Sequence, residues 1–311
     1  MDSGRIHHAW LLTGAEGIGK ASFARAAATR LLADAAGPPV HLPSLETPED
    51  HPVAHYIRAG SHPDLRILAR LTKDKSEDLA RSINIDQVRS LQSLFVTTPS
   101  LSPRRVVIID AIDDLERNAA NALLKNLEEP PAGTVFFLVS HVPGRLLPTI
   151  RSRCRQLRFS RLSDAQMELA LLRLLPDEPR DEIDALVKAG EGSPGRALSF
   201  AGLDIGEIDA AIDRLVGEGD PTNAVRSRLA RQLGGKAAQA RYEAYLDRVP
   251  IRIAAEARRR RGPALAAAVA LWEEARRVSE SAVHLSLDPS TTAFELATML
   301  AKLAPDSAPA R

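Results

Sequence analysis

Continuous apolar runs alternate with helix-like patterns along the first 160 residues. The runs AWLLT at 9–13, RRVVIID at 104–110 and TVFFLVS at 134–140 are typical of strands buried on both faces of a parallel sheet. Between them, 84–98 has apolar residues at helical spacing, and NAANALLKNLEEPP at 118–131 predicts a helix that ends at its prolines. Strands that alternate with helices predict an α/β fold with a parallel sheet up to about residue 160.

The pattern changes after Phe159, where strand signals give way to helical periodicity alone. Two amphipathic segments, 163–175 and 180–190, predict a small helical lid over residues 161–203. From residue 204 onward alanine, leucine and arginine dominate, and the apolar spacing is that of helices throughout. We therefore predict three domains: an α/β nucleotide-binding-type domain at 1–160, the lid at 161–203 and an all-helical domain at 204–311.

Composition narrows the functional classes. With 44% hydrophobic residues, 26% charged residues and a net charge of +1, the chain is neither disordered nor a globally basic nucleic-acid binder. Its single cysteine, Cys154, excludes an internal disulfide and a multi-thiolate zinc site. No apolar run approaches the roughly 20 residues of a membrane span, and the first residues lack the apolar centre of a signal peptide. We expect a soluble protein of the cytoplasm without a membrane partner.

The stretch GAEGIGK at 14–20 has the pattern of a phosphate-binding loop. It follows a predicted strand and opens a predicted helix, which is the context that such a loop requires. Gly14, Gly17 and Gly19 would let the backbone approach phosphates, and Lys20 would supply a positive charge. The alternative is an ordinary glycine-rich turn, which gives no reason for a lysine at position 20.

The residues that normally hold the metal and the attacking water are missing. Ala21 stands where a serine or threonine hydroxyl would reach Mg²⁺, and Ser22 is rotated by about 100° along the helix. Asp110, at the end of a predicted strand, could hold a metal through water, but it is followed by Ala111 instead of a second acid. The sequence thus predicts a degenerate nucleotide site that binds ATP or ADP weakly, with no metal site.

Several motifs together give the chain a family resemblance. The triplet Ser152-Arg153-Cys154 lies in LLPTIRSRCRQLRF, and SHPDLRIL, INIDQVRSL and EGSPGRAL occur elsewhere in the same order as in known relatives. This combination resembles the bacterial clamp-loader subunits of the AAA+ class, and in particular the delta prime family of DNA polymerase III subunits. The resemblance covers roughly residues 7–200, while the last hundred residues are similar to the family's collar domain only in length and helical character.

The resemblance assigns roles to three further residues. It implies that Arg153 is an arginine finger that projects into the ATP site of a neighbouring subunit; the alternative is a surface arginine in a basic run. It places Ser140 where motor subunits sense the γ-phosphate. It also likens Arg196 to the sensor arginine of the lid, although motor subunits carry that arginine one residue earlier, where this chain has Gly195.

The function implied is that of a non-motor clamp-loader subunit. Such a subunit acts in a hetero-oligomer with gamma/tau and delta subunits, which loads the sliding clamp on primed DNA at the expense of ATP. We expect no ATPase activity of the chain on its own. The alternatives are an active gamma/tau-like motor subunit, which Ala21 and Ala111 disfavour, and a small-molecule P-loop kinase, which would not explain the Ser152-Arg153-Cys154 triplet.

The proline-rich stretch at 34–63 stands where many relatives carry a four-cysteine zinc module. Its histidines, at positions 41, 51, 55 and 62, are interpreted as solvated loop residues, so no zinc is expected. Only 13 residues precede Gly14, whereas relatives usually have a helical segment there, and we expect contacts to an adenine base to be incomplete. The basic run at 257–262 is interpreted as a solvated helix end.

Overall fold

The computed structural model describes residues 6–72 and 79–305. The chain divides into two compact units. The first comprises residues 1–163 together with the short segment 192–195, and the second comprises 164–191 and 196–311.

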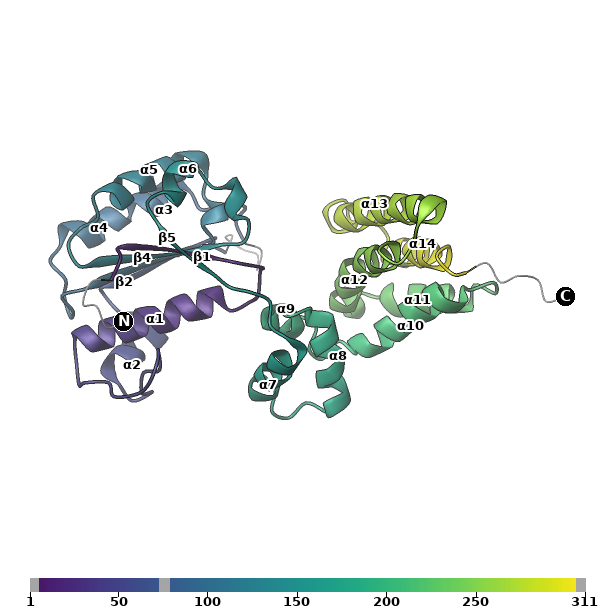
Figure 1. Ribbon diagram of the computed structural model, residues 1–311, viewed down its shortest axis with the longest axis horizontal. Helices are drawn as coiled ribbons and strands as arrows, with labels where there is room; N and C mark the ends of the chain where they lie inside the picture. The colour runs from purple at the N-terminus through teal and green to yellow at the C-terminus, as the bar shows by residue number, and fades with distance from the viewer. Residues whose placement is uncertain (1–5, 73–78, 306–311) are drawn as a thin grey trace. The chain divides into compact units, whose positions relative to one another are not determined.

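A five-stranded parallel sheet forms the centre of the first unit (Figure 1). Its strands are β1 (Ala9–Thr13), β2 (Leu65–Ala69), β3 (Arg105–Asp110), β4 (Thr134–Ser140) and β5 (Arg155–Arg158). They lie in the order β2-β3-β4-β1-β5, which confirms the predicted α/β class. Because all five strands are parallel, the carboxyl ends of β1, β3 and β4 lie at the same edge of the sheet, where open parallel sheets bind their ligands.

Helices cover both faces of this sheet (Figure 1). One face carries α1 (Lys20–Ala35) and α2 (Pro52–Arg58); the other carries α3 (Ile85–Arg89), α4 (Leu91–Val96), α5 (Arg117–Glu128) and α6 (Pro148–Arg151). Successive strand residues enter the two cores in turn, so Val106 and Ile108 pack under α1, whereas Val107 and Ile109 pack under α5. The four central residues of β3, Val106 to Ile109, are all apolar because both faces of the strand are buried.

Two local features differ from the sequence expectation. The helical pattern at 84–98 forms α3 and α4, which meet at Ser90, instead of one helix. The proline-rich stretch contains the unpredicted helix α2, which begins where the His51 ring accepts a hydrogen bond from the Val53 N–H at 3.2 Å. Pro52 takes the first helical position, where its missing N–H costs nothing.

Arg30 of α1 holds the rest of this stretch against the helix. Its guanidinium donates to the carbonyls of Val40, Leu42 and Glu46 at 2.9–3.1 Å and forms an ion pair with Asp34 at 2.7 Å. A planar group with five N–H donors suits a turn of converging carbonyls. An arginine therefore orders a segment that has little apolar surface of its own.

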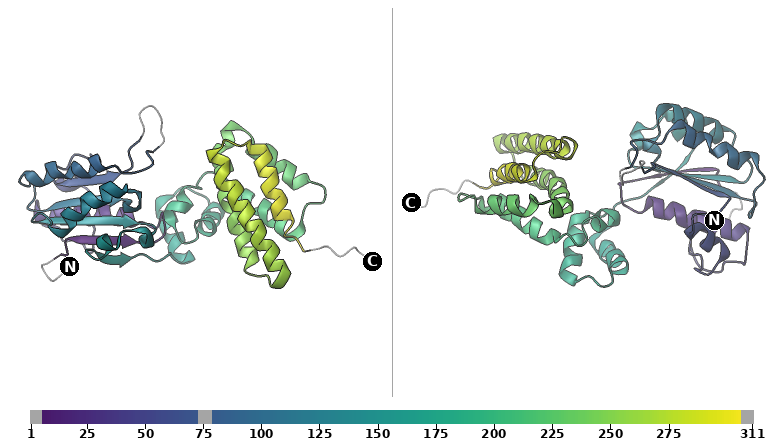
Figure 2. Two further views of the ribbon diagram at one scale, coloured as in Figure 1. Left: turned by 90° about the horizontal axis from the view of Figure 1, so that it is seen from above. Right: turned by 180° about the vertical axis from the view of Figure 1, so that it is seen from behind.

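The second unit is helical throughout the part of it that the structure describes (Figures 1 and 2). Its helices are α7 (Asp164–Leu174), α8 (Arg180–Gly190), the last three residues of α9 (Pro194–Leu198), α10 (Ile205–Glu218), α11 (Ala224–Leu233), α12 (Gln239–Ala257), α13 (Gly262–His284) and α14 (Pro289–Ala301). In Figure 1, α13 runs along α12, and α14 packs against α11. Among all described residues, no helix is long and apolar enough to cross a membrane.

Candidate functional site

The phosphate-loop residues, Asp110 and Ser140 converge at the carboxyl edge of the sheet. Thr13, which precedes the loop, is the register partner of Ser140, and Asp110 pairs with the residue before Ser140. The loop then leads directly into the first turn of α1. The structure thus brings together the loop, the acid and the polar residue that the sequence singled out.

The glycines of the loop are required by its backbone. Gly17 and Gly19 have φ angles of 70° and 97°, in the left-handed region that side chains disfavour. A Cβ atom added to Gly14 would lie 2.6 Å from the carbonyl oxygen of Phe159. These constraints explain the three glycines without a bound phosphate.

Lys20 is turned back into the loop that it follows. Its amine donates to the carbonyl oxygens of Gly14 at 2.8 Å and Ala15 at 2.6 Å, and the residue is only 2% exposed. Burial lowers the pKa of this amine, although the carboxylates of Glu16, Asp110 and Asp113 act in the opposite direction. The ammonium group therefore interacts with carbonyl oxygens and nearby carboxylates of its own chain.

The segment 192–195 closes over the same loop. The N–H of Gly195 donates to the Gly17 carbonyl at 2.8 Å, and the Ser193 hydroxyl donates to the Glu16 carbonyl at the same distance. A Cβ atom at position 195 would lie 2.7 Å from the Gly17 Cα, so the contact requires glycine. The sequence did not reveal this contact, because it joins residues about 180 positions apart.

The residues around the loop do not fit a magnesium-bound nucleotide. Ala21 carries a methyl group at the position of the metal-binding hydroxyl, and the Ser22 side chain belongs to an exposed residue of α1. Ala111 is a 3% exposed apolar residue after Asp110, so no acid stands there to orient water. The loop therefore lacks the metal-binding hydroxyl and the second acid, and a degenerate nucleotide site stays a prediction.

Asp113 is a residue to which the sequence analysis gave no role. Its carboxylate accepts hydrogen bonds from the Ser140 hydroxyl at 2.9 Å, the His141 N–H at 2.6 Å and the Val142 N–H at 3.3 Å. It thereby fixes the turn after β4 to the turn after β3. The fully buried Ser140 hydroxyl donates to Asp113, and its role as a phosphate sensor stays a prediction.

Arg153 lies just after α6, close to the end of α5. Its guanidinium forms an ion pair with Glu128 at 2.6 Å and donates to the Thr149 carbonyl at 2.8 Å, and about a third of the side chain is exposed. The next residue, Cys154, packs against the core between the sheet and α5, and burial raises the pKa of its thiol to about 11. Arg155 instead places its guanidinium 5.3 Å from the centre of the Trp10 ring.

Arg196 is engaged within the second unit. Its guanidinium lies 3.4 Å from the Glu191 carboxylate and 5.8 Å from the centre of the Phe200 ring. Arg248 lies at the same distance from that ring and forms an ion pair with Asp209. The predicted role of Arg196 toward phosphate stays a prediction.

The interpretation of the loop histidines as solvated is wrong for two of them, because His51 is 5% exposed and His62 is 3% exposed. His51 caps α2 and contacts the Pro38 carbonyl at 3.2 Å, while the His62 ring accepts the Asp64 N–H at 3.1 Å. Within residues 6–72 and 79–305, no group of three or more histidine, cysteine, aspartate or glutamate side chains is arranged to hold a metal ion.

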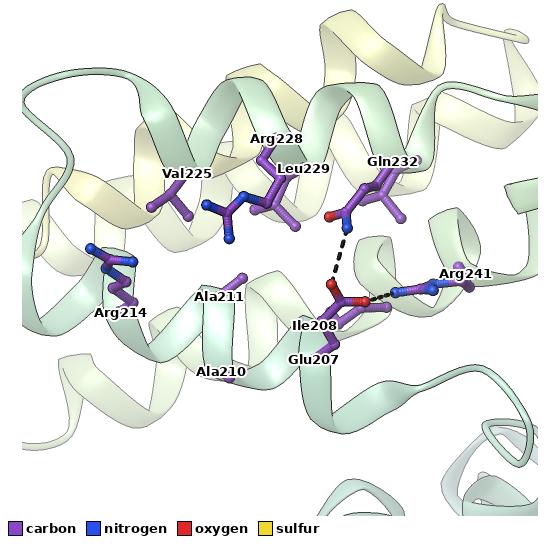
Figure 3. Close-up of a pocket in the computed structure, with 11 residues that line it drawn as sticks. Glu207, Ile208, Ala210, Ala211, Arg214, Val225, Arg228, Leu229, Gln232 and Arg241 are labelled. Carbon is purple, nitrogen blue, oxygen red and sulfur yellow. Dashed lines mark hydrogen bonds and ion pairs between the residues drawn. The ribbon is translucent and has the colours of Figure 1, made fainter.

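A cavity of about 190 Å³ lies between α10 and α11 in the second unit (Figure 3). Apolar side chains such as Ile208 and Leu229 line it, and at one end Glu207 accepts hydrogen bonds from Gln232 at 3.0 Å and Arg241 at 2.6 Å. These bonds lower the pKa of Glu207, so this end carries a fixed ion pair. The residues that line this cavity include neither a nucleophile nor an acid–base pair, so the candidate functional site is the one in the first unit.

Comparison with known proteins decides the family. The family described as "DNA polymerase III, delta subunit" matches residues 1–163, just over half of the chain. The chain belongs to this family. A DNA polymerase III subunit delta' of Pseudomonas aeruginosa is 39% identical over 209 residues, which cover 66% of this chain and 59% of that protein. The corresponding subunit of Escherichia coli is 33% identical over 204 residues, which cover 64% and 55%.

The similarity extends to related subunits at a lower level. The tau subunit of Salmonella typhimurium is 31% identical over 217 residues, which are 68% of this chain and 31% of that protein. The matched part thus spans less than two thirds of the length of each of these relatives. The resemblance to the delta prime family, first inferred from the motifs, is confirmed, and the residues 1–163 contain both the phosphate loop and Arg153.

Proposed function

We propose that the chain is a non-motor subunit of the DNA polymerase III clamp loader. It joins gamma/tau and delta subunits in a cytoplasmic complex that places the sliding clamp on primed DNA. The observation that carries this proposal is a contrast within the first unit. The Lys20 amine is buried and donates hydrogen bonds to two carbonyls of its own loop, whereas the Arg153 guanidinium is partly exposed at the surface.

The chain itself does not turn over nucleotide. Hydrolysis needs a metal ion that spreads the phosphate charge and a group that orients the attacking water. Ala21 and Ala111 supply neither group, and nucleotide binding would have to displace the Lys20 amine from its two carbonyls. ATP or ADP is therefore bound weakly or not at all by this subunit.

Arg153 contributes to the reaction of a neighbouring subunit. Arginine is permanently charged and presents a planar fork that matches phosphate oxygens. In other systems an arginine finger contributes about 10³ to 10⁵ in rate. We expect a smaller effect on the turnover rate here, because several ATP sites of one complex contribute to the measured turnover.

The test is ATP turnover by the reconstituted clamp loader in the presence of clamp and primed DNA. Arg153→Ala should lower the turnover and loading rates in a complex shown intact by gel filtration, and Arg153→Lys should restore them poorly. Arg155→Ala is the matched control, because that guanidinium lies over Trp10 and should affect turnover much less. An unchanged rate with Arg153→Ala removes the proposed role.

Lys20→Ala separates a passive subunit from a motor. The substitution should hardly change turnover by the complex, since the amine binds only its own loop. Multiple turnovers by the isolated chain, abolished by Lys20→Ala, would instead identify an active ATPase.

A further inference from the structure

Glu128 contacts the guanidinium of Arg153 from a different element. It is the last residue of α5, and its carboxylate lies 2.6 Å from Arg153 Nη2. Arg153 Nη1 donates separately to the Thr149 carbonyl of α6 at 2.8 Å. The guanidinium is thus held at two of its nitrogens, by two elements that both pack on the core between the sheet and α5.

The position of Glu128 is unfavourable for the helix that carries it. The carboxyl end of a helix has a partial negative charge, and an acidic side chain there is repelled. The pair with Arg153 offsets this repulsion, because it places a cation at the end of α5. Helix stability therefore does not account for a glutamate at this position.

An arginine side chain loses considerable rotamer freedom when it is fixed on a ligand. A contact that orders the arginine side chain before phosphate is bound lowers the entropy that must be lost on reaching the transition state. The guanidinium has five N–H donors, so bonds to Glu128 and Thr149 leave others for phosphate oxygens.

We infer that Glu128 is a positioning residue for Arg153, which holds the guanidinium ready for the phosphate of the neighbouring subunit. This inference rests on the proposed function. The pair is partly exposed, with 32% and 49% of the two side chains accessible, so it orients the arginine without locking it.

The experiment compares four variants and one control variant of this chain in the reconstituted clamp loader, with kcat and KM for ATP measured at saturating clamp and primed DNA. Glu128→Ala should lower kcat by about two- to fivefold, the range expected for a partly exposed pair, with little change in KM. Glu128→Gln, which keeps an acceptor oxygen, should lose less. Glu128→Ala combined with Arg153→Ala should match Arg153→Ala alone, because Glu128 acts only through Arg153.

Glu129→Ala is the control. Glu129 is adjacent, equally placed in the helix dipole, and forms no ion pair within the described part of the chain. It should leave kcat unchanged.

The outcomes separate the inference from the proposed function. If Arg153→Ala has no effect, both fail. If Arg153→Ala lowers kcat but both Glu128 variants leave it unchanged or raise it, only the inference is overturned, and a rise would mean that Glu128 competes with phosphate. A double variant slower than Arg153→Ala alone, or an equal loss with Glu129→Ala, also overturns it.

Discussion

Asp64 is a buried acid whose loss should destabilise the first unit. It directly precedes β2, is 2% exposed, and its carboxylate accepts three backbone hydrogen bonds. The donors are the N–H groups of Ser100 and Leu101, both at 2.8 Å, and of Ser102 at 3.1 Å. One carboxylate therefore shapes the turn that leads from α4 into β3.

The cost of Asp64→Ala follows from where these donors lie. Ser100 and Leu101 are exposed, so water can replace the carboxylate at about 0.5–1.5 kcal/mol for each bond. Ser102 is 4% exposed, and its unpaired N–H should cost about 1–3 kcal/mol. Together they predict a loss of about 2–6 kcal/mol in the free energy of unfolding. Asp64→Asn, which keeps one acceptor oxygen, should cost less than Asp64→Ala.

The assay is urea unfolding followed by tryptophan fluorescence. Trp10 lies in β1 of the first unit and Trp272 in α13 of the second, so a Trp272→Phe background reports on the first unit alone. Asp86→Ala is the control, because this acid is 81% exposed in its pair with Arg89. A loss below about 1 kcal/mol for Asp64→Ala, or a similar loss for Asp86→Ala, would refute the reasoning.

Two further predictions concern ionisable groups. At pH 8 the Cys154 thiol should react with iodoacetamide about a hundredfold more slowly in the native protein than after unfolding, since burial raises its pKa from 9.0 to about 11; equal rates would contradict its burial. Burial acts to raise the pKa of Asp220. Hydrogen bonds from the Arg226 and Val225 N–H groups and from the Arg226 side chain outweigh this effect, so the pKa is lowered overall. Asp220 should therefore stabilise the fold fully above its ordinary pKa of 3.8 and lose this effect as the pH falls through its lower folded pKa. The difference in unfolding free energy between the native chain and Asp220→Asn, measured from pH 7 to pH 3, should shrink only below about pH 4, and a constant difference would contradict it.

The sequence predicted the centre of the sheet because burial on both faces leaves a strong local signal. Val106 to Ile109 are all apolar, and nothing but a buried strand or a buried helix segment requires this. Helix α2 left no such signal, since only Val53 among its residues is buried and its start depends on the His51 cap. Short elements held by caps and by arginine contacts are therefore missed where long apolar elements are found.

The site shows the same division between local and distant causes. The glycines of the phosphate loop could be predicted from the sequence because the φ angle is a local property. The hydrogen bonds of Lys20 to Gly14 and Ala15 could not, because they depend on which rotamer the side chain adopts. The contacts of Arg153 come from α5 and α6, whereas those of Lys20 come from the loop between β1 and α1. Because the two sets share no partner, changes in one should alter the other little. The proposed loss of nucleotide chemistry at the loop is therefore compatible with intact surroundings of Arg153, the proposed arginine finger.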